Sequence, residues 1–180
     1  MSVSLAIRPM DSRDIRSVLA IQSRCYDEAK QESAASFLSK LISPLQTSFV
    51  AELGEDVVGY LVSVPVQDCG PLPLHDTDYC LPGQAVALYL HDLAVRPEAR
   101  SFGVAAALIN AYLSALRSTD LRSGCLTAVN DSSRFWQRYG FRDSTPAGPD
   151  AVRLASYGPD ARFMTLDLPH PSIRAQRAGA

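Results

Sequence analysis

The chain has 180 residues, of which 47% are hydrophobic and 20% charged, and its formal net charge is -2 at pH 7. This size fits one globular domain with a real core, and the charge excludes a strongly basic surface for nucleic acid or an anionic membrane. The four cysteines have no C-x-x-C spacing, which argues against a zinc site or a dense disulfide framework. We expect a cytoplasmic protein that binds a small molecule and no metal; a homodimer is left open.

The first third of the chain predicts a strand, two helices and a hairpin. A short strand at residues 4–9 is closed by a proline, and residues 10–29 carry apolar residues near helical spacing behind Asp11, the expected N-cap. A second helix is expected at residues 34–42. The β-rich runs 47–53 and 57–66 flank a glycine-containing turn, which is typical of a hairpin.

The rest of the chain alternates strands and helices after a long loop at residues 67–83. We expect a buried strand at 85–95, a helix at 103–117, a strand at 122–129, a short helix at 132–140, and a closing hairpin of strands 151–157 and 162–168. Residues 169–180 are expected to form a mobile C-terminal tail. This order predicts one α/β (α+β) domain over residues 1–168, built on a mixed sheet.

The stretch "AVRPEARSFGVAAA" at residues 94–107 joins a predicted strand to a predicted helix. The first amide groups of a helix have no partner inside it, and that end of the helix attracts anions. Gly103 permits unusual backbone angles, small residues follow it, and Arg100 adds a positive charge. These features favour a pyrophosphate-like ligand, although the sequence contains neither G-x-x-x-x-G-K-[ST] nor G-x-G-x-x-G. The alternative is a solvated turn followed by alanines that have no role beyond forming the helix.

Two segments resemble the GNAT superfamily of N-acetyltransferases. "RSFGVA" at residues 100–105 fits its Q/R-x-x-G-x-G/A signature and follows "LHDLAVRPEAR", while "FWQRYGF" at 135–141 is similar to its F-Y-x-x-x-G-F segment. The resemblance covers roughly residues 5–168. It implies a single GNAT-type domain with a splayed mixed sheet flanked by helices.

The resemblance also implies acetyl-CoA as co-substrate, bound between the strands that end near Val95 and Ala128. The main chain of Leu93, Ala94 and Val95 is expected to pair with the pantetheine arm. The remaining residues expected at the cofactor are Arg100, Ser101, Phe102, Gly103, Val104 and Ala105 at the pyrophosphate, with Asn130 and Trp136 on the other wall.

Acetyl transfer to an amine requires a base for the amine and a proton for the departing thiolate. Candidate bases are Tyr89, His91 and Asp92, and His91 is favoured because histidine titrates near neutrality. "YLHDL" is similar to the "HLHAL" strand of the arylalkylamine N-acetyltransferases, but Tyr89 stands at the first histidine position. A buried histidine bonded to the backbone is the alternative for His91, and Asp92 could instead bind the charge of the amine.

The expected proton donor is where the sequence departs from the family. The usual tyrosine of the F-Y pair is replaced by Trp136, whose indole N–H does not give up its proton. Tyr139, three residues on, is the remaining candidate acid, with core packing as its alternative. Water or direct release of the thiolate could also suffice.

The expected function is acetyl transfer to the primary amine of a small molecule by direct attack in a ternary complex. Protein or peptide N-acetylation and a non-catalytic acyl-CoA-binding module are the alternatives. The loop with Asp68, His75, Asp76 and Asp78 is expected near the substrate entrance, where acidic groups could attract a cationic amine. By family analogy, Tyr26 and Phe37 would complete the acceptor pocket.

Overall fold

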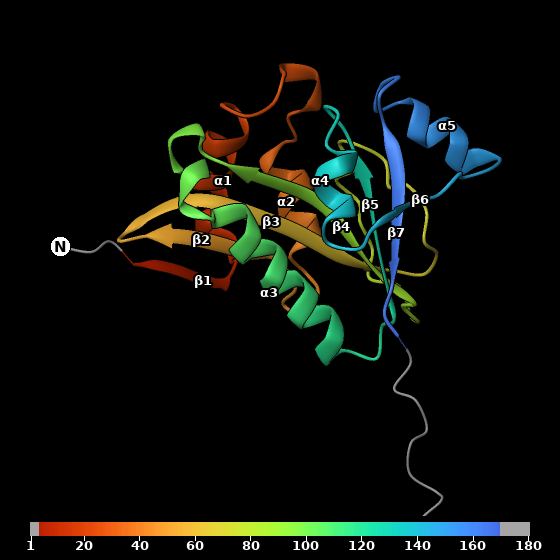
Figure 1. Cartoon of the computed structure of the whole chain (residues 1–180), viewed down its shortest axis with the longest axis horizontal. Helices are drawn as coiled ribbons and strands as arrows, with labels where there is room; N and C mark the ends of the chain where they lie inside the picture. Colours follow the sequence, from red (N-terminus) through yellow and green to blue (C-terminus); the bar gives the residue numbers. More distant parts are fainter. Residues whose placement is uncertain (1–3, 170–180) are drawn as a thin grey trace, which may run out of the picture.

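The computed structural model describes residues 4–169, in which seven strands form one mixed sheet in the order β1-β2-β3-β4-β5-β7-β6 (Figure 1). The strands are β1 (Leu5–Pro9), β2 (Phe49–Leu53), β3 (Asp56–Val66), β4 (Ala87–Val95), β5 (Ser123–Ala128), β6 (Arg142–Asp143) and β7 (Arg162–Asp167). The helices are α1 (Ile15–Gln22), α2 (Ala34–Lys40), α3 (Val104–Ser118), α4 (Ser133–Gln137) and α5 (Pro149–Ala155), with short 3-10 helices η1 (Ser12–Asp14), η2 (Glu28–Lys30) and η3 (Pro97–Phe102). Only β4 and β5 pair in parallel within this sheet. The predicted α/β fold is confirmed.

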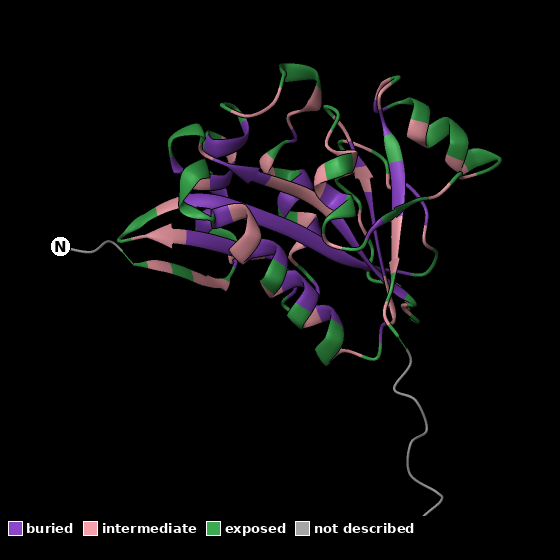
Figure 2. Ribbon diagram, in the orientation of Figure 1, coloured by how far each residue is buried: buried purple, intermediate pink, exposed green. Residues whose placement is uncertain are grey.

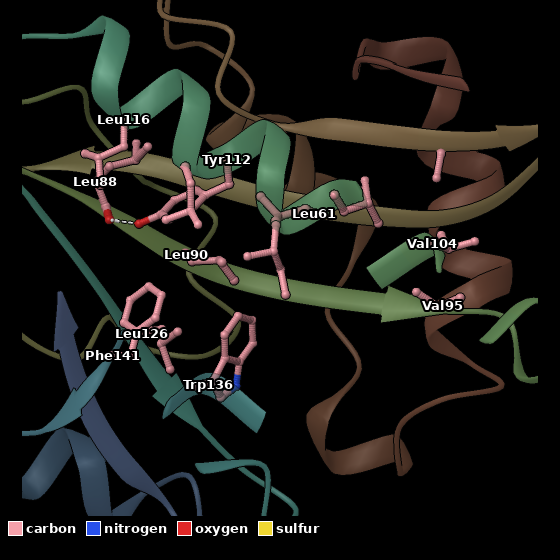
Figure 3. Packing of buried hydrophobic residues seen from close by; sticks show 14 of the residues in the cluster. Leu61, Leu88, Leu90, Val95, Val104, Tyr112, Leu116, Leu126, Trp136 and Phe141 are labelled. Carbon is pink, nitrogen blue, oxygen red and sulfur yellow. Dashed lines mark hydrogen bonds between the residues drawn. The ribbon is translucent and has the colours of Figure 1, made fainter. Parts of the chain in front are cut away.

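Helices cover both faces of the sheet. The amphipathic helix α3 packs its buried side against β2, β3 and β4, and α1 and α2 pack on the opposite face (Figure 1). Figure 2 shows the central strands buried along most of their length. On the α3 face the Tyr112 hydroxyl donates to the Leu88 carbonyl at 2.7 Å (Figure 3), and on the other face Phe37 meets the Tyr60 ring edge-on. The two layers fix β4 in the middle of the molecule.

The N-terminal helical region begins where the sequence predicts. Asp11 accepts a hydrogen bond from the Arg13 amide, and Asp14 accepts one from the Asp11 amide, which together form a capping box. This cap belongs to the 3-10 turn η1, and α1 is shorter than the predicted span. The second helix starts behind Ser33, whose hydroxyl accepts from the Ser36 amide.

Strand β4 carries a bulge in the middle. Val62 pairs with Asp92 and Ser63 pairs with Leu90, so His91 is the extra residue in the ladder. Before the bulge, Leu88 and Leu90 contribute to the core under α3. The extra residue changes the alternation of faces, so His91 and Asp92 both point toward the α1 and α2 side.

The predicted strand at residues 151–157 is wrong. Residues 149–155 form helix α5, which begins after Gly148 at φ 57 with Pro149 in its first turn. Proline suits the first helical position because its missing N–H has no partner there. Strand β7 pairs instead with β5 and the two-residue β6. The predicted tail lies outside the described residues, apart from Pro169.

Candidate active site

Strands β4 and β5 separate and leave a cleft between them. They pair only from Ala87 with Ser123 to Leu90 with Leu126, and farther along no strand pairs with β4 on that side in residues 4–169. The Tyr26 hydroxyl lies 2.8 Å from the Leu93 carbonyl oxygen, and Arg100 Nε lies 3.4 Å from the Val95 carbonyl oxygen. The Arg96 amide donates to the Val58 carbonyl of β3 at 2.8 Å, so the alternate carbonyls of Leu93 and Val95 face away from β3 and toward the cleft.

The cleft holds a cavity of about 510 Å³. Of the residues predicted to bind a cofactor, Leu93, Arg100, Asn130 and Trp136 line it. Ala94, Val95 and the segment from Ser101 to Ala105 do not line it; they continue from the cavity wall through η3 into α3.

The junction between η3 and α3 turns sharply at Gly103. Its φ is 73, a left-handed conformation that favours glycine, and a Cβ there would meet nothing within 4 Å. Val104 is fully buried and sits directly against Gly59 of β3, where a Cβ would meet the valine at 2.9 Å. The first amides of α3 are thereby fixed at the end of β4, pointing away from the helix, as an anion site requires.

The other wall of the cavity follows β5. Asn130 and Asp131 both adopt positive φ, at 54 and 55. The Asn130 amide donates to Asp160 Oδ2 at 2.7 Å, and its side-chain oxygen accepts from Lys30 Nζ at 2.8 Å. Lys30 comes from η2, so this exposed hydrogen bond joins the two sides of the cavity.

His91 belongs to a buried group of ionisable side chains. Its Nε2 lies 2.7 Å from Glu32 Oε2, and Lys40 Nζ lies 3.5 Å from the same oxygen, with each side chain at most 3% exposed. Burial alone would raise the pKa of Glu32, but the hydrogen bond and charge of His91 and the charge of Lys40 hold it at about 2. His91 Nδ1 is buried and has no hydrogen-bond partner in the described residues.

Glu32 is itself held in place from several directions. Gln22 of α1 donates to the Glu32 carbonyl at 2.6 Å and accepts from its amide at 3.0 Å. The His75 amide donates to Glu32 Oε1 at 2.7 Å. The backbone of Glu32 is therefore held by α1, and its carboxylate is held by α2, β4 and the loop before β4.

Asp92 lies beside His91 on the same face. Its two carboxyl oxygens lie 2.7 Å from the Tyr26 hydroxyl and 2.6 Å from the Tyr60 hydroxyl. Burial raises the pKa of Asp92 against the opposing effect of these two hydrogen bonds.

Residues 67–86, which we name the covering loop, close this side of the cavity. Ser36 Oγ and Lys40 Nζ both donate to the Asp76 carbonyl, at 2.9 and 3.0 Å. At the other side the Tyr157 hydroxyl donates to the Leu72 carbonyl at 2.5 Å. Leu74, between these anchors, lines the cavity. The covering loop thus bridges α2 and the segment after α5.

The acidic residues of the covering loop have different positions. Asp68 and Asp78 are exposed, and neither lines the cavity. His75 Nε2 lies 3.1 Å from the Ala29 carbonyl oxygen, and the Asp76 carbonyl is the anchor for α2. The loop therefore acts here mainly through its backbone.

Known proteins share this sequence pattern and this fold. A model of the acetyltransferase (GNAT) family matches residues 15–141. The chain belongs to the GNAT acetyltransferase family. It is therefore an acyltransferase by family. No curated protein sequence matches it.

Solved GNAT structures resemble the chain over most of its length. Ard1 from Thermoplasma volcanium is 23% identical, with a TM-score of 0.69 over 93% of this chain and 99% of that one. The ribosomal-protein-S18-alanine N-acetyltransferase from Escherichia coli is 15% identical, with a TM-score of 0.69 over 96% and 99%. PaiA N-acetyltransferase from Thermoplasma acidophilum, solved with coenzyme A, is 13% identical, with a TM-score of 0.62 over 91% and 99%. At these identities the likeness concerns the fold.

Two of the predicted catalytic tyrosines of this GNAT chain do not line the cavity. Tyr89 is fully buried, its hydroxyl lies 2.9 Å from Thr127 Oγ1, and burial raises its pKa to about 12. Tyr139 packs edge-on against Phe135 at 5.3 Å. Trp136 does line the cavity, and its ring packs edge-on against Phe135 and Phe141. Figure 3 shows Trp136 together with Phe141.

Glu32 is the site residue that the sequence reasoning missed. It lies 59 positions from His91 in the chain, directly before the N-cap Ser33, and no motif surrounds it. Only the bulge in β4 and the packing of α1 and α2 bring the two side chains together. No residues between 4 and 169 form a three-residue cluster suited to a metal, and no helix there is long and apolar enough to cross a membrane.

Proposed function

We propose that the chain transfers an acetyl group from acetyl-CoA to the primary amine of a small molecule, by direct attack in a ternary complex. The observation that carries this proposal is the open edge of β4, where the backbone groups of Leu93 and Val95 lead directly to the free amides behind Gly103. An extended amide chain can pair with the strand edge, and a pyrophosphate can bind the helix N-terminus. The family match supports this use of the cleft.

Acetyl-CoA would supply the activated thioester. Leu93, Ala94 and Val95 would hold the pantetheine arm, and Arg100 with the amides from Phe102 to Ala105 would hold the pyrophosphate. Asn130 would bond the cofactor from the other wall, once its hydrogen bond with Lys30 gives way.

The covering loop favours a small acceptor over a polypeptide. It is anchored to α2 through Asp76 and to Tyr157 through Leu72, so a chain crossing this face would have to displace both anchors. A small amine needs only the cavity of about 510 Å³. The structurally similar enzyme from Escherichia coli is a ribosomal-protein-S18-alanine N-acetyltransferase, which keeps a protein amine as the second candidate.

His91 is the proposed base, and it takes the amine proton through an intervening water molecule. With Nε2 bonded to the Glu32 carboxylate, a neutral imidazole carries its proton on Nε2 and leaves Nδ1 free to accept. The side chain is only 1% exposed, so the amine would pass its proton to Nδ1 through water rather than by direct contact. Glu32 would then stabilise the imidazolium.

A panel of small amines and peptides, assayed for free CoA thiol, tests this function. Turnover with small amines and none with peptides is the expected result, and acetyl-CoA should raise the melting temperature because it binds the folded state. Preferred turnover of a peptide would select the second candidate. Binding of acetyl-CoA without turnover of any amine would indicate a non-catalytic acyl-CoA-binding module, and no thermal shift at millimolar acetyl-CoA would reject the cleft assignment.

A further inference from the structure

Asp92 lies in a set of hydrogen-bond contacts that has one hydroxyl proton too few. The Tyr26 hydroxyl lies 2.7 Å from Asp92 Oδ1 and 2.8 Å from the Leu93 carbonyl oxygen, while the Tyr60 hydroxyl lies 2.6 Å from Asp92 Oδ2. Each phenol has a single proton to donate, so two hydroxyls cannot serve three acceptor contacts. A proton on Asp92 Oδ1 completes the set: Asp92 donates to Tyr26, Tyr26 donates to Leu93, and Tyr60 donates to Asp92.

The surroundings of Asp92 favour this neutral form. Within residues 4–169 the carboxyl group forms no ion pair, and a buried carboxylate without a cation is costly. Burial raises the pKa of Asp92, and the nearby carboxylate of Glu32 acts in the same direction. The two tyrosines and His91 act in the opposite direction.

Tyr26 connects this carboxyl group to the cleft. It lines the cavity, and its hydroxyl reaches Leu93 at the strand edge proposed to hold the pantetheine arm. Burial raises the pKa of Tyr26, which keeps the phenol protonated. Of the other tyrosines near the cavity, Tyr89 bonds Thr127 and Tyr157 bonds the Leu72 carbonyl. Tyr26 is therefore the phenol placed at the reacting edge.

We propose that Tyr26 donates the proton that the departing CoA thiolate requires and that Asp92 resupplies Tyr26. This proposal rests on the proposed function and gives Tyr26 the role that Trp136 cannot fill. As the C–S bond breaks, its electron pair stays on sulfur, sulfur takes the Tyr26 proton, and the Asp92 proton moves to the Tyr26 oxygen. Asp92 is left as a carboxylate.

The protons released and taken up balance over one turnover. The amine loses one proton to His91 and the thiolate gains one from Tyr26, so an imidazolium and a carboxylate form on adjacent residues. Their charges offset each other on the same face of β4, and exchange of one proton through solvent restores both groups. Asp92 acts through Tyr26 and is a positioning residue and proton source rather than a group that touches substrate.

The activity test removes the hydroxyl of Tyr26 and then introduces a new one at Trp136, on the opposite wall of the cavity. Tyr26→Phe should lower kcat about 100-fold, the size expected for a general acid, with the KM for acetyl-CoA within about threefold. Adding Trp136→Tyr to that variant should restore at least a tenth of the wild-type kcat, because it returns a phenol to the cavity. Tyr112→Phe, whose hydroxyl donates to the Leu88 carbonyl under α3 and does not line the cavity, is the matched control and should keep wild-type turnover.

Two outcomes overturn the proposal. A Tyr26→Phe variant with kcat within threefold of wild type would show that its proton is not needed. A loss that Trp136→Tyr does not rescue would assign Tyr26 a structural role.

An infrared measurement tests the proton on Asp92 without any turnover. At neutral pH the wild-type protein should show the carbonyl stretch of a protonated carboxylic acid, and the band should be missing in Asp92→Asn. Its absence from the wild type overturns the proposal. If the band is present but the wild type acetylates no amine on the panel, the proposed function fails while the protonated Asp92 stands, so the two failures are distinguishable.

Discussion

The two sides of the cleft use different parts of the chain. We call residues 93–105 the cofactor edge, and we call the group of Gln22, Tyr26, Glu32, His91 and Asp92 the acceptor side. The cofactor edge presents main-chain groups of one continuous segment. The acceptor side gathers side chains from α1, the loop before α2, and the bulge of β4, and buries them. A backbone site tolerates changes of side chain but depends on conformation, whereas a buried side-chain network fails when one partner is removed.

The largest expected effect comes from the acceptor side, in the variant His91→Gln. Glutamine can still donate an amide hydrogen to Glu32 but cannot accept the amine proton, so kcat should fall about 100-fold or more. The acetyl-CoA thermal shift should stay as in wild type because the cofactor edge is untouched. Tyr89→Phe is the matched control and should change kcat less than threefold, since its hydroxyl faces Thr127. Wild-type turnover by His91→Gln would make His91 a structural partner of Glu32.

The next effect is on stability, in Glu32→Gln. The pKa of this carboxyl group lies at about 2 in the fold against an ordinary 4.5, so Glu32 adds stability above pH 4.5 and loses it as the pH falls toward 2. That difference corresponds to about 3 kcal/mol of unfolding free energy at pH 7. Urea unfolding of both proteins from pH 7 to pH 2 should show a gap that narrows below pH 4.5. Glu98→Gln, which removes an exposed pair with Arg24, should show no comparable gap; a gap for Glu32→Gln that is constant with pH would contradict the assignment.

The cofactor edge is tested by Gly103→Val. A β-branched residue at φ 73 is strained by about 1–2 kcal/mol, and relaxing that strain moves the first amides of α3, so the acetyl-CoA thermal shift should be largely lost. Gly148→Val carries a larger strain, because the combination of φ 57 and ψ −132 is open essentially only to glycine, and it lies far along the chain in front of α5. It should cost at least as much stability as Gly103→Val and keep the full thermal shift. Equal shifts in both variants would separate Gly103 from cofactor binding.

The same contrast explains what the sequence could predict. The path of β4 into α3 follows from local rules: a buried apolar strand, a glycine turn and an amphipathic helix. The sequence therefore predicts this strand and this helix to within two residues of their bounds, but not the 3-10 helix η3 between them. The bulge at His91 leaves no local signal, because an extra residue in a strand does not alter its composition. Regular alternation along a strand would put His91 and Asp92 on opposite faces, whereas the structure puts both on one face.

Long-range packing accounts for the remaining differences. Glu32 and Tyr26 meet β4 across about 60 residues of chain, a contact that no spacing rule reaches. The segment 151–157 has strand-like composition, but Pro149 behind Gly148 starts a helix, and β7 already has its partners in β5 and β6. At position 103 a side chain would have room, and the strain of a substitution would come from the positive φ alone.

The smallest expected effect is that of an exposed lysine at the cleft entrance, Lys30, and it is compared with the buried Lys40, which lies against the acceptor side. Lys40 is buried and bonds Ser36 and the Asp76 carbonyl beside Glu32, and burial lowers its pKa. Lys40→Met should cost about 3 kcal/mol or more of unfolding free energy, because it removes these hydrogen bonds and leaves the buried Glu32 carboxylate without its lysine partner. Lys30→Met removes only the exposed bond to Asn130 and should stay within about 0.5 kcal/mol, with a KM for acetyl-CoA within threefold of wild type. Urea unfolding measures the loss of stability in both variants, and steady-state kinetics measures the KM. If Lys30→Met lost as much stability as Lys40→Met, the entrance of the cleft would be as tightly coupled to the fold as its buried acceptor side.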